Sequence, residues 1–388
     1  MRKFLFAIIF VLAGTNVFAM TFKIGDDSID LYASIRAFTV FNHTDSGDRA
    51  ICGGVERNCS QFLIGLQPNT LAGVRWTKGD FFLHNEWGMD AANSNVALRL
   101  MYGDYKFAGG DSGRIRIGQF TGTANTHSYY DRKLNGDWGL QGFGTIYAQR
   151  RVGINYEVGG FSVSAISMRQ DSSRVTGAFN NSGLSNVVFS EIMPRIEAAW
   201  SISSVKIAGS YVKSSITADR IAGEGIVDRN RRYGIDAGHI MFAANPKIAE
   251  NMRLNVSGFY SVNGGMYQMV SIGGGFNDNE AVDKTIWALP SVKEPGSTDM
   301  NNTSAYGGAI AVVVDKFEAG FGIQSAVNDA WEDNQTGMGV YANYKFRVSN
   351  IFRITPEVAY LHSGDFRGNK EVKDTRGLQV GIQFRFDL

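Results

Sequence analysis

Arginines stand at alternate positions in several stretches of the chain. In 112-SGRIRIGQF-120, Arg114 and Arg116 alternate with Ile115 and Ile117. An arginine stays charged at physiological pH, and its planar guanidinium forks onto carboxylates. A row of such groups along a water-filled passage would favour anionic or carboxylate-bearing solutes. Where the polar face is clear, it carries Arg36, Arg75, Arg114, Arg116, Arg151, Arg195 and Lys206, with Glu86, Glu157 and Glu197 on the same side.

Residue types that serve catalysis or metal binding are sparse. The five histidines, His43, His84, His127, His239 and His362, are spread over different segments without zinc spacing, and no Gly-x-Ser-x-Gly stretch occurs. The glycine run 272-IGGGF-276 lacks the Lys-Ser/Thr of a phosphate loop. We therefore predict no enzyme, no cofactor and no metal. Acidic residues in 266–302 leave a calcium-binding or adhesive surface as a minor alternative, although their spacing matches no dedicated calcium loop.

Alternation of apolar and polar residues with a period of two defines the elements that must position these charges. The last stretch, 377-GLQVGIQFRFDL-388, places Leu378, Val380 and Ile382 on one face and Gln379 and Gln383 on the other. Such alternation predicts β-strands with one apolar face. We count sixteen, at about 30–42, 70–77, 81–90, 96–107, 114–120, 145–158, 161–171, 191–203, 205–217, 233–247, 253–265, 303–314, 317–328, 337–349, 352–365 and 376–388.

The connections between these strands alternate in length. Turns such as 78–80 and 159–160 are tight, whereas the predicted loops 43–69, 121–144, 172–190, 218–232 and 266–302 are long. A soluble β-sandwich has no reason to sort its loops in this way, but an outer-membrane barrel does. The sequence therefore predicts an all-β fold, a transmembrane antiparallel up-and-down barrel of about 16 strands with short periplasmic turns and long external loops. Its apolar face meets lipid, and its polar face encloses water.

The first nineteen residues have the layout of a cleaved secretory signal peptide. Arg2 and Lys3 precede an apolar stretch, and Val17 and Ala19 stand at the −3 and −1 positions. We expect residues 20–388 to form a single barrel domain in the outer membrane of a Gram-negative cell. The mature chain would carry 38 − 2 = 36 basic against 37 acidic residues. This near-neutral balance argues against nucleic acid as a partner.

Two cysteines lie close together in 51-ICGGVERNCS-60. In an oxidising compartment we expect a disulfide between Cys52 and Cys59, which the chain-entropy model values at roughly 2–3 kcal/mol. No histidine accompanies the pair, which argues against a metal site there.

Four stretches resemble the sixteen-stranded trimeric porins of Gram-negative bacteria. They are 29-IDLYASIRAF-38, 112-SGRIRIGQF-120, the hairpin 145-TIYAQRRVGINYEVGGFSVSA-165 and the last strand. The resemblance implies a homotrimer in the lipid bilayer, in contact with lipopolysaccharide, and a terminal signal for the outer-membrane assembly machinery. That signal would comprise Phe384, Phe386 and Leu388, although the family usually ends in Phe or Trp.

The resemblance also implies that loop 121–144 folds into the lumen as a constriction. Candidate gate-lining charges in it are Asp131, Arg132, Lys133 and Asp137, and the alternative is that they form ion pairs that fix the loop to the wall. This loop lacks the family's usual acidic signature, so a cation preference does not follow. Arg150, next to Arg151, would face lipid by strict alternation, so we expect it at a rim or a bulge.

These patterns together predict a passive diffusion channel for small hydrophilic solutes, with a preference for anions or carboxylates. The alternative is a substrate-selective channel for small carboxylates or sugars that has a saturable internal site. An outer-membrane enzyme or adhesin is less favoured by the sequence.

Overall fold

The computed structural model describes most of the chain from Met20 to Leu388. Residues outside the description are 1–19, 47–57, 68, 91–94, 109–111, 135–138, 148, 168–183, 223–224, 268–269, 273–285, 288–289, 293–299, 330–333, 365, 368–370 and 373. The predicted signal peptide, Cys52 and Asp137 therefore lie outside the described residues. The Cys52–Cys59 disulfide stays a prediction.

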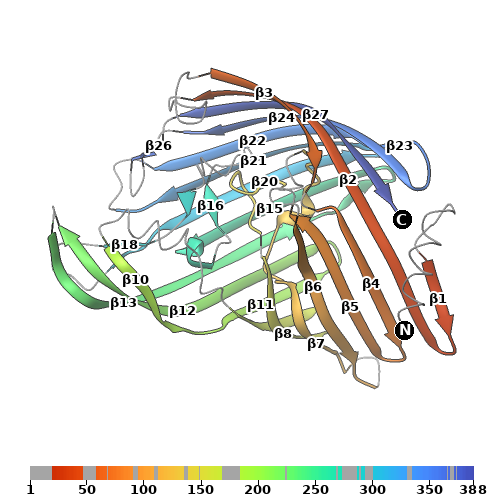
Figure 1. Cartoon of the computed structure of the whole chain (residues 1–388), viewed down its shortest axis with the longest axis horizontal. Helices are drawn as coiled ribbons and strands as arrows, with labels where there is room; N and C mark the ends of the chain where they lie inside the picture. Colours follow the sequence, from red (N-terminus) through yellow and green to blue (C-terminus); the bar gives the residue numbers. More distant parts are fainter. Residues whose placement is uncertain are drawn as a thin grey trace.

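The described residues form a closed antiparallel barrel of sixteen strands, which confirms the predicted fold (Figure 1). Four of the sixteen consist of two segments in line, because the hydrogen-bond ladder is interrupted. In order around the wall they are β2 (Asp27–Ser46), β3 (Asn58–Leu66) with β4 (Leu71–Lys78), β5 (Phe81–Asp90), β6 (Asn95–Lys106), β7 (Arg114–Thr121), β8 (Arg150–Val158), β9 (Phe161–Ile166), β10 (Leu184–Ile192) with β11 (Arg195–Ile202), β12 (Val205–Ala222), β13 (Gly225–Ala244) with β14 (Lys247–Ala249), β15 (Met252–Val262), β20 (Ser304–Val314), β21 (Phe317–Val327), β22 (Gln335–Tyr344) with β23 (Phe346–Arg347), β24 (Phe352–Ser363) and β27 (Thr375–Asp387).

The barrel closes where the first and last wall strands pair. Strand β2 pairs with β27 from Ser34 opposite Asp387 to Ser46 opposite Thr375. Beyond the end of β27, the short strand β1 (Met20–Ile24) continues along β2, with Met20 opposite Leu31. Closure leaves no long sheet edge unpaired, which is a requirement for any sheet placed in lipid.

Proline positions explain two interruptions in the ladder. Pro194 separates β10 from β11, and both segments pair with β12. Pro356 lies in β24 beside the break between β22 and β23. Proline has no N–H to donate, so a strand can tolerate it only where a ladder bond is missing.

Several predicted boundaries were wrong, although the strands themselves were found. The predicted loop 218–232 is mostly strand, because β12 and β13 continue pairing to Ala222 and Gly225. The predicted loop 43–69 likewise contains β3 and the end of β2. Charged residues are frequent in 219–232, so this stretch lacks the apolar alternation that marks a strand in the membrane. Strand β3 keeps an alternation, with Phe62, Ile64 and Leu66 exposed on its outer face, but it is short and has polar residues on both sides.

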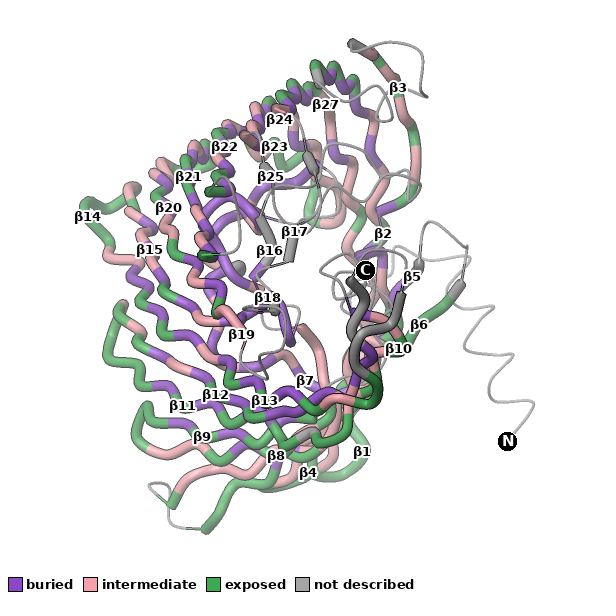
Figure 2. The backbone as a smooth tube through the Cα atoms, turned by 90° about the vertical axis from the view of Figure 1, so that its left-hand side faces the viewer, coloured by how far each residue is buried: buried purple, intermediate pink, exposed green. Residues whose placement is uncertain are grey.

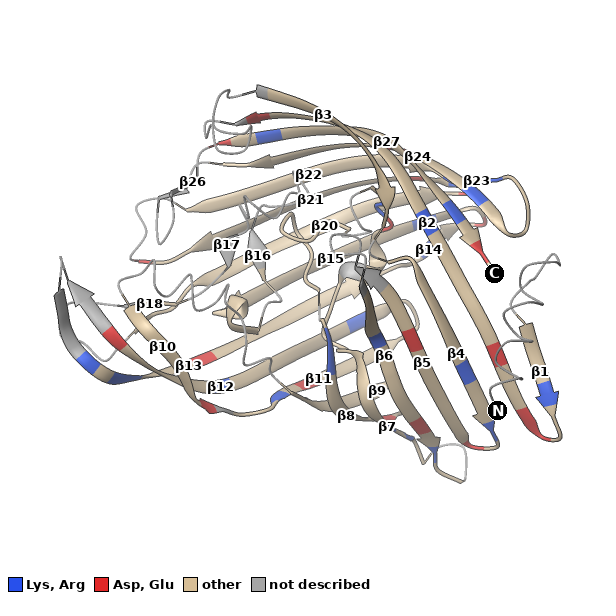
Figure 3. Cartoon of the chain, viewed as in Figure 1, with Lys and Arg blue, Asp and Glu red and all other residues tan. Residues whose placement is uncertain are grey.

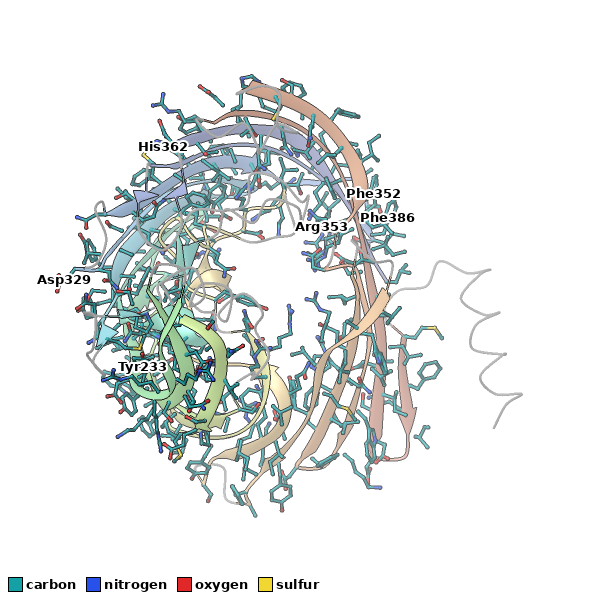
Figure 4. The ribbon with its side chains drawn as sticks, turned by 60° about the vertical axis from the view of Figure 1, so that its left-hand side comes forward. Tyr233, Asp329, Phe352, Arg353, His362 and Phe386 are labelled. Atoms are coloured by element: carbon teal, nitrogen blue, oxygen red, sulfur yellow. The ribbon has the colours of Figure 1, made fainter. Side chains whose placement is uncertain are left out.

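Burial alternates along the strands as the sequence pattern requires (Figure 2). On β27 the side chains of Leu378, Val380 and Phe386 are exposed on the outside, whereas Gln379 and Gln383 are each 1% exposed on the inside. Phe386 stacks on Phe352 of β24 with ring centres 4.4 Å apart (Figure 4). An apolar outer surface would be costly in water and is favourable against lipid. Among the described residues, no helix is long and apolar enough to cross a membrane.

Candidate functional site in the barrel interior

The connection from β7 to β8 runs inside the barrel and covers part of its inner wall. Three inward-facing glutamates bind its backbone: Glu197 on β11, Glu318 on β21 and Glu357 on β24. Each carboxylate accepts a peptide N–H, which is a charge-assisted hydrogen bond. Because these strands are spread around the wall, the loop is held over a wide arc. We call the part from β11 to β27, together with the adjoining inner face of β2 and β3, the covered half.

The first anchor lies just after β7. Glu197 accepts the N–H of Thr123 at 2.6 Å and forms an ion pair with Arg195 at 2.8 Å. The side chain of Arg195 is 2% exposed and that of Glu197 is not exposed. Nearby, His239 Nε2 donates to the carbonyl of Ala124 at 3.0 Å. Arg195, which the sequence placed on the water side, therefore belongs to the loop attachment rather than to a wetted surface.

The second anchor holds Asp131. Glu318 accepts the N–H of Asp131 at 2.8 Å, and Lys345 lies between the two carboxylates, 2.6 Å from Asp131 and 3.0 Å from Glu318. Lys133 also pairs with Asp131. Burial alone would raise the pKa of Asp131, but the ammonium groups of Lys133 and Lys345 outweigh it and hold this pKa below its usual value. Burial raises the pKa of Tyr130 to about 12, so its phenol stays protonated and donates to the Ala309 carbonyl at 2.6 Å.

The third anchor is on β24. Glu357 accepts the N–H groups of Lys133 at 2.5 Å and Leu134 at 3.1 Å, and its carboxylate lies 3.5 Å from Arg132. Arg132 also bonds with Gln379 of β27. Its side chain is 3% exposed and that of Glu357 is fully buried. Asp131 and Arg132 thus form ion pairs with wall residues, whereas Lys133 pairs with Asp131 within the loop.

Apolar contacts fill the rest of the covered half. Leu134 packs with Phe38 and Val40 of β2, and Leu140 packs in a cluster with Tyr341 and Leu361. A larger cluster spans the inner faces of β11–β15 and includes Ile146 from the loop. On the return path, Gly144 has φ +116° and lies so close to the Gly308 carbonyl that a Cβ there would clash. This half of the interior is a packed core.

The inner faces of β4–β8 differ, because arginines there remain partly exposed to solvent, although Asp104 beside them is buried; we call this the open half. Figure 3 shows the charged positions on β4, β5 and β6. Arg114 bonds with Glu157 at 2.5 Å and Asp104 at 3.3 Å, and its side chain is 31% exposed. Arg116 binds the same Asp104 at 2.7 and 2.8 Å and is 21% exposed. Arg99 pairs with Glu86 at 2.9 Å. These ion pairs form a network along the wall.

Arg75 of β4 is exposed and has no ion pair within the described part of the chain. Its guanidinium carbon lies over the ring of Tyr32 at 4.5 Å from the ring centre. If the part of β2 from Asp27 to Arg36 is counted with the open half, inward cations outnumber inward carboxylates among the described side chains. The cations are Arg36, Arg75, Arg99, Lys106, Arg114, Arg116 and Arg151, and the carboxylates are Asp30, Glu86, Asp104 and Glu157.

The remaining sequence-predicted residues fall at separate places. Arg36 faces inward and donates to Ser34 at 3.1 Å, and Arg151 bonds with Gln149 beside Phe120. The guanidinium carbon of Arg150 lies 6.0 Å from the centre of the Tyr147 ring. Arg99 and Glu86 are close enough to interact with it electrostatically, so Arg150 does not face lipid. Phe384 and Phe386 lie on the outer face of β27, and Leu388 follows the strand and exchanges backbone hydrogen bonds with Ala33 of β2. Cys59 lies on β3, opposite Thr44.

Sequence reasoning missed two of the three anchors. Glu318 and Glu357 stand on the polar faces of the stretches 317–328 and 352–365, where nothing in the pattern separates them from wall charges such as Glu157. Glu318 is the only charged residue of β21, which is the one signal available, whereas Glu357 shares its face of β24 with Arg353. Among the described residues, no group of three or more metal-ligating side chains occurs.

Comparisons with known proteins agree on the fold. No protein-family model matches the chain, and no curated protein matches it in sequence. Solved structures do match along nearly the whole chain. One is the outer membrane channel DcaP of Acinetobacter baumannii, with 10% identity and a TM-score of 0.60 over 95% of this chain and 99% of that one.

Two further structures give a similar picture. The anion-selective porin from Comamonas acidovorans has 12% identity and a TM-score of 0.55, covering 93% of this chain and 100% of that one. The outer membrane protein OmpT of Vibrio cholerae has 13% identity and a TM-score of 0.52, covering 95% and 100%. The chain therefore has the fold of the integral outer-membrane porins, as its sequence motifs suggested.

Proposed function

We propose that this protein is a passive diffusion channel for small hydrophilic solutes across the outer membrane, with a preference for anions. One observation carries the proposal: inside a barrel with an apolar exterior, the arginines of one half remain accessible to solvent while a loop packs against the other half. Solutes would pass between the loop and the open half. The net positive wall there would lower the free energy of an anion relative to a cation.

Passage requires no covalent step. Loop 121–144 would narrow the lumen, and its described residues are held in place by the three glutamate anchors and the apolar clusters. The excess of guanidinium groups attracts anions into the passage, and carboxylates of the same wall keep binding weak enough for release. That two of the similar structures are described as a channel and as an anion-selective porin supports the proposal.

The expected surroundings follow from the fold. The apolar outer face would contact the lipid bilayer and, at its outer rim, lipopolysaccharide. The outward Phe384, Phe386 and Leu388 would present the terminal signal to the assembly machinery. A homotrimer and a cleaved signal peptide of residues 1–19 are part of the same proposal.

Reconstitution of the purified chain in a planar bilayer tests the function. We expect stepwise, ohmic currents and, under a KCl gradient, a reversal potential on the anion-selective side. A folded, heat-modifiable protein without any conductance would refute the channel and favour an enzyme or an adhesin. A cation-selective reversal potential would keep the channel and refute the role of the arginines.

The second candidate function, a substrate-selective channel with a saturable internal site, is favoured by Arg75, which makes no ion pair among the described residues. A general diffusion channel needs only a net charge on its wall, whereas an exposed guanidinium of this kind is suited to holding one carboxylate. Currents that saturate with one solute but not with chloride would distinguish the two.

A further inference from the structure

Four aromatic rings gather beside the arginines on the open half, on the inner faces of β2, β5 and β6. The ring centre of His84 lies 5.9 Å from that of Tyr32, 5.3 Å from that of Tyr102 and 6.1 Å from that of Phe82. Phe82 is also 6.2 Å from Tyr102. These rings with Arg75 and Arg116 form what we call the aromatic–arginine cluster, and Figure 3 shows the charged segments of β4, β5 and β6 side by side.

Hydrogen bonds fix the rings in place. Tyr32 donates its hydroxyl proton to Glu86 at 2.8 Å. Its oxygen must then accept from His84 Nε2, 2.5 Å away. That tautomer leaves His84 Nδ1 to accept the hydroxyl of Tyr102 at 3.1 Å. Each of these three hydrogen bonds thus has one consistent donor and one consistent acceptor.

A glycine on the neighbouring strand β4 leaves room for the Tyr32 ring. Gly73 lies under the Tyr32 ring, and a Cβ at this position would clash with the Tyr32 hydroxyl. The absence of a side chain at Gly73 lets the ring lie flat against the wall. Arg75, two residues further on the same face, then covers the ring from the lumen side.

The two guanidinium groups differ in what they can still bind. Arg116 lies over the Tyr102 ring at 4.2 Å from its centre, but its nitrogens are engaged with Asp104. Arg75 lies over the Tyr32 ring at a similar distance and forms a hydrogen bond with the Tyr32 oxygen, but it makes no ion pair among the described residues. A guanidinium has five N–H donors, so those that Tyr32 does not use can still bind a carboxylate. The adjoining Phe82 is a partly exposed apolar ring on an otherwise polar wall.

We propose that the aromatic–arginine cluster is a saturable binding site for planar aromatic carboxylates. This inference rests on the proposed function, because a ligand reaches the cluster only through the lumen. The carboxylate would bind the free edge of Arg75, and the aromatic ring would pack against Phe82 and the edge of Tyr102. Because the rings are already held in place, less conformational entropy is lost when the ligand binds. The neighbouring positive charge of Arg116 favours an anionic ligand.

Three small solutes separate the contribution of the carboxylate charge from that of the aromatic ring in a planar-bilayer experiment. Benzoate carries both the ring and the charge, acetate carries only the charge, and benzamide carries only the ring. We expect benzoate to reduce the KCl current along a saturating titration curve. Acetate and benzamide at the same concentrations should leave the current nearly unchanged.

Matched variants locate the site. Arg75→Gln should raise the half-blocking benzoate concentration at least about tenfold, the loss expected for a hydrogen bond to a charged group. Phe82→Leu, which keeps an apolar side chain but removes the ring, should raise it about three- to tenfold. Arg114→Gln removes the same charge from the same wall outside the cluster. It should shift the reversal potential but change the benzoate block less than about threefold, because Arg114 is connected to the cluster only through Asp104, which it shares with Arg116.

Two results would overturn the inference. One is an equal effect of benzoate and acetate on the wild-type current. The other is an equal loss of block in Arg75→Gln and Arg114→Gln, with both variants folded by heat modifiability. If anion selectivity persists without a saturable block, the site is refuted while the channel stands. If no current appears at all, the proposed function fails as well.

Discussion

The two halves of the barrel interior use the same residue types for different purposes. In the covered half, Glu357 and Arg132 are both at most 3% exposed, and they join loop to wall. In the open half, Glu157 and Arg114 form a similar pair with side chains that are 44% and 31% exposed. The loop excludes water from one pair and not from the other. A charge therefore acts as structural support or as part of a selective surface according to what lies over it.

The difference matters energetically because water screens the exposed pair. An exposed ion pair contributes about 0–1 kcal/mol to stability. Removal of one partner from a buried pair leaves an uncompensated charge and costs about 3–5 kcal/mol. The open half can thus carry a net charge toward solutes at little cost to folding, and the covered half cannot.

The largest expected effect comes from Glu357→Ala. This change leaves Arg132 buried without its carboxylate and frees the N–H groups of Lys133 and Leu134, so we expect a loss of about 3–5 kcal/mol in stability. A lower transition temperature in the heat-modifiability assay and a larger, noisier single-channel conductance would show this loss of stability. A variant with wild-type melting and conductance would mean that Glu357 does not hold the loop.

A second pair of variants compares one arginine from each half. Arg116→Ser should shift the reversal potential toward cations, because it removes a partly exposed cation from the wall of the open half. Arg132→Ser should leave the reversal potential within error and lower the thermal stability instead, by about 3 kcal/mol. Equal shifts in the reversal potential would show that Arg132 also faces the passage.

Acid should loosen the covered half at Asp131. Its pKa lies below the usual value, so the folded state favours the ionised form. The resulting stabilisation is complete above the unfolded pKa of about 3.9 and is lost as pH falls below it. We expect open-channel noise to rise between about pH 4 and pH 2. Asp131→Asn should show that noise already at pH 7 and lose the dependence on pH.

The smallest effect on stability is expected for Glu157→Gln in the open half. Its exposed pair with Arg114 should change the free energy of unfolding by less than about 1 kcal/mol. Anion selectivity should increase, since a carboxylate is removed from the wall. A melting shift as large as that of Glu357→Ala would abolish the distinction between the halves.

Much of the wall could be predicted from the sequence, and the loop contacts could not. Each of the sixteen predicted stretches overlaps a wall strand, because lipid on one side and polar groups on the other impose a period of two. The strand ends around Ala222 were missed because charged residues interrupt the alternation there, and β3 was missed although Phe62, Ile64 and Leu66 alternate, because the strand is short. The same alternation with a period of two predicted that Arg75, Arg114 and Arg116 point inward.

The sequence by itself determined which face of each strand meets lipid, since a shift of one residue would bring every charge to the wrong side. Only the tertiary structure decided which inward charges meet water. Glu318 binds a peptide group 187 positions away and Glu357 one 224 positions away. No local pattern encodes such contacts, because they depend on where the closed wall brings distant strands around the inserted loop.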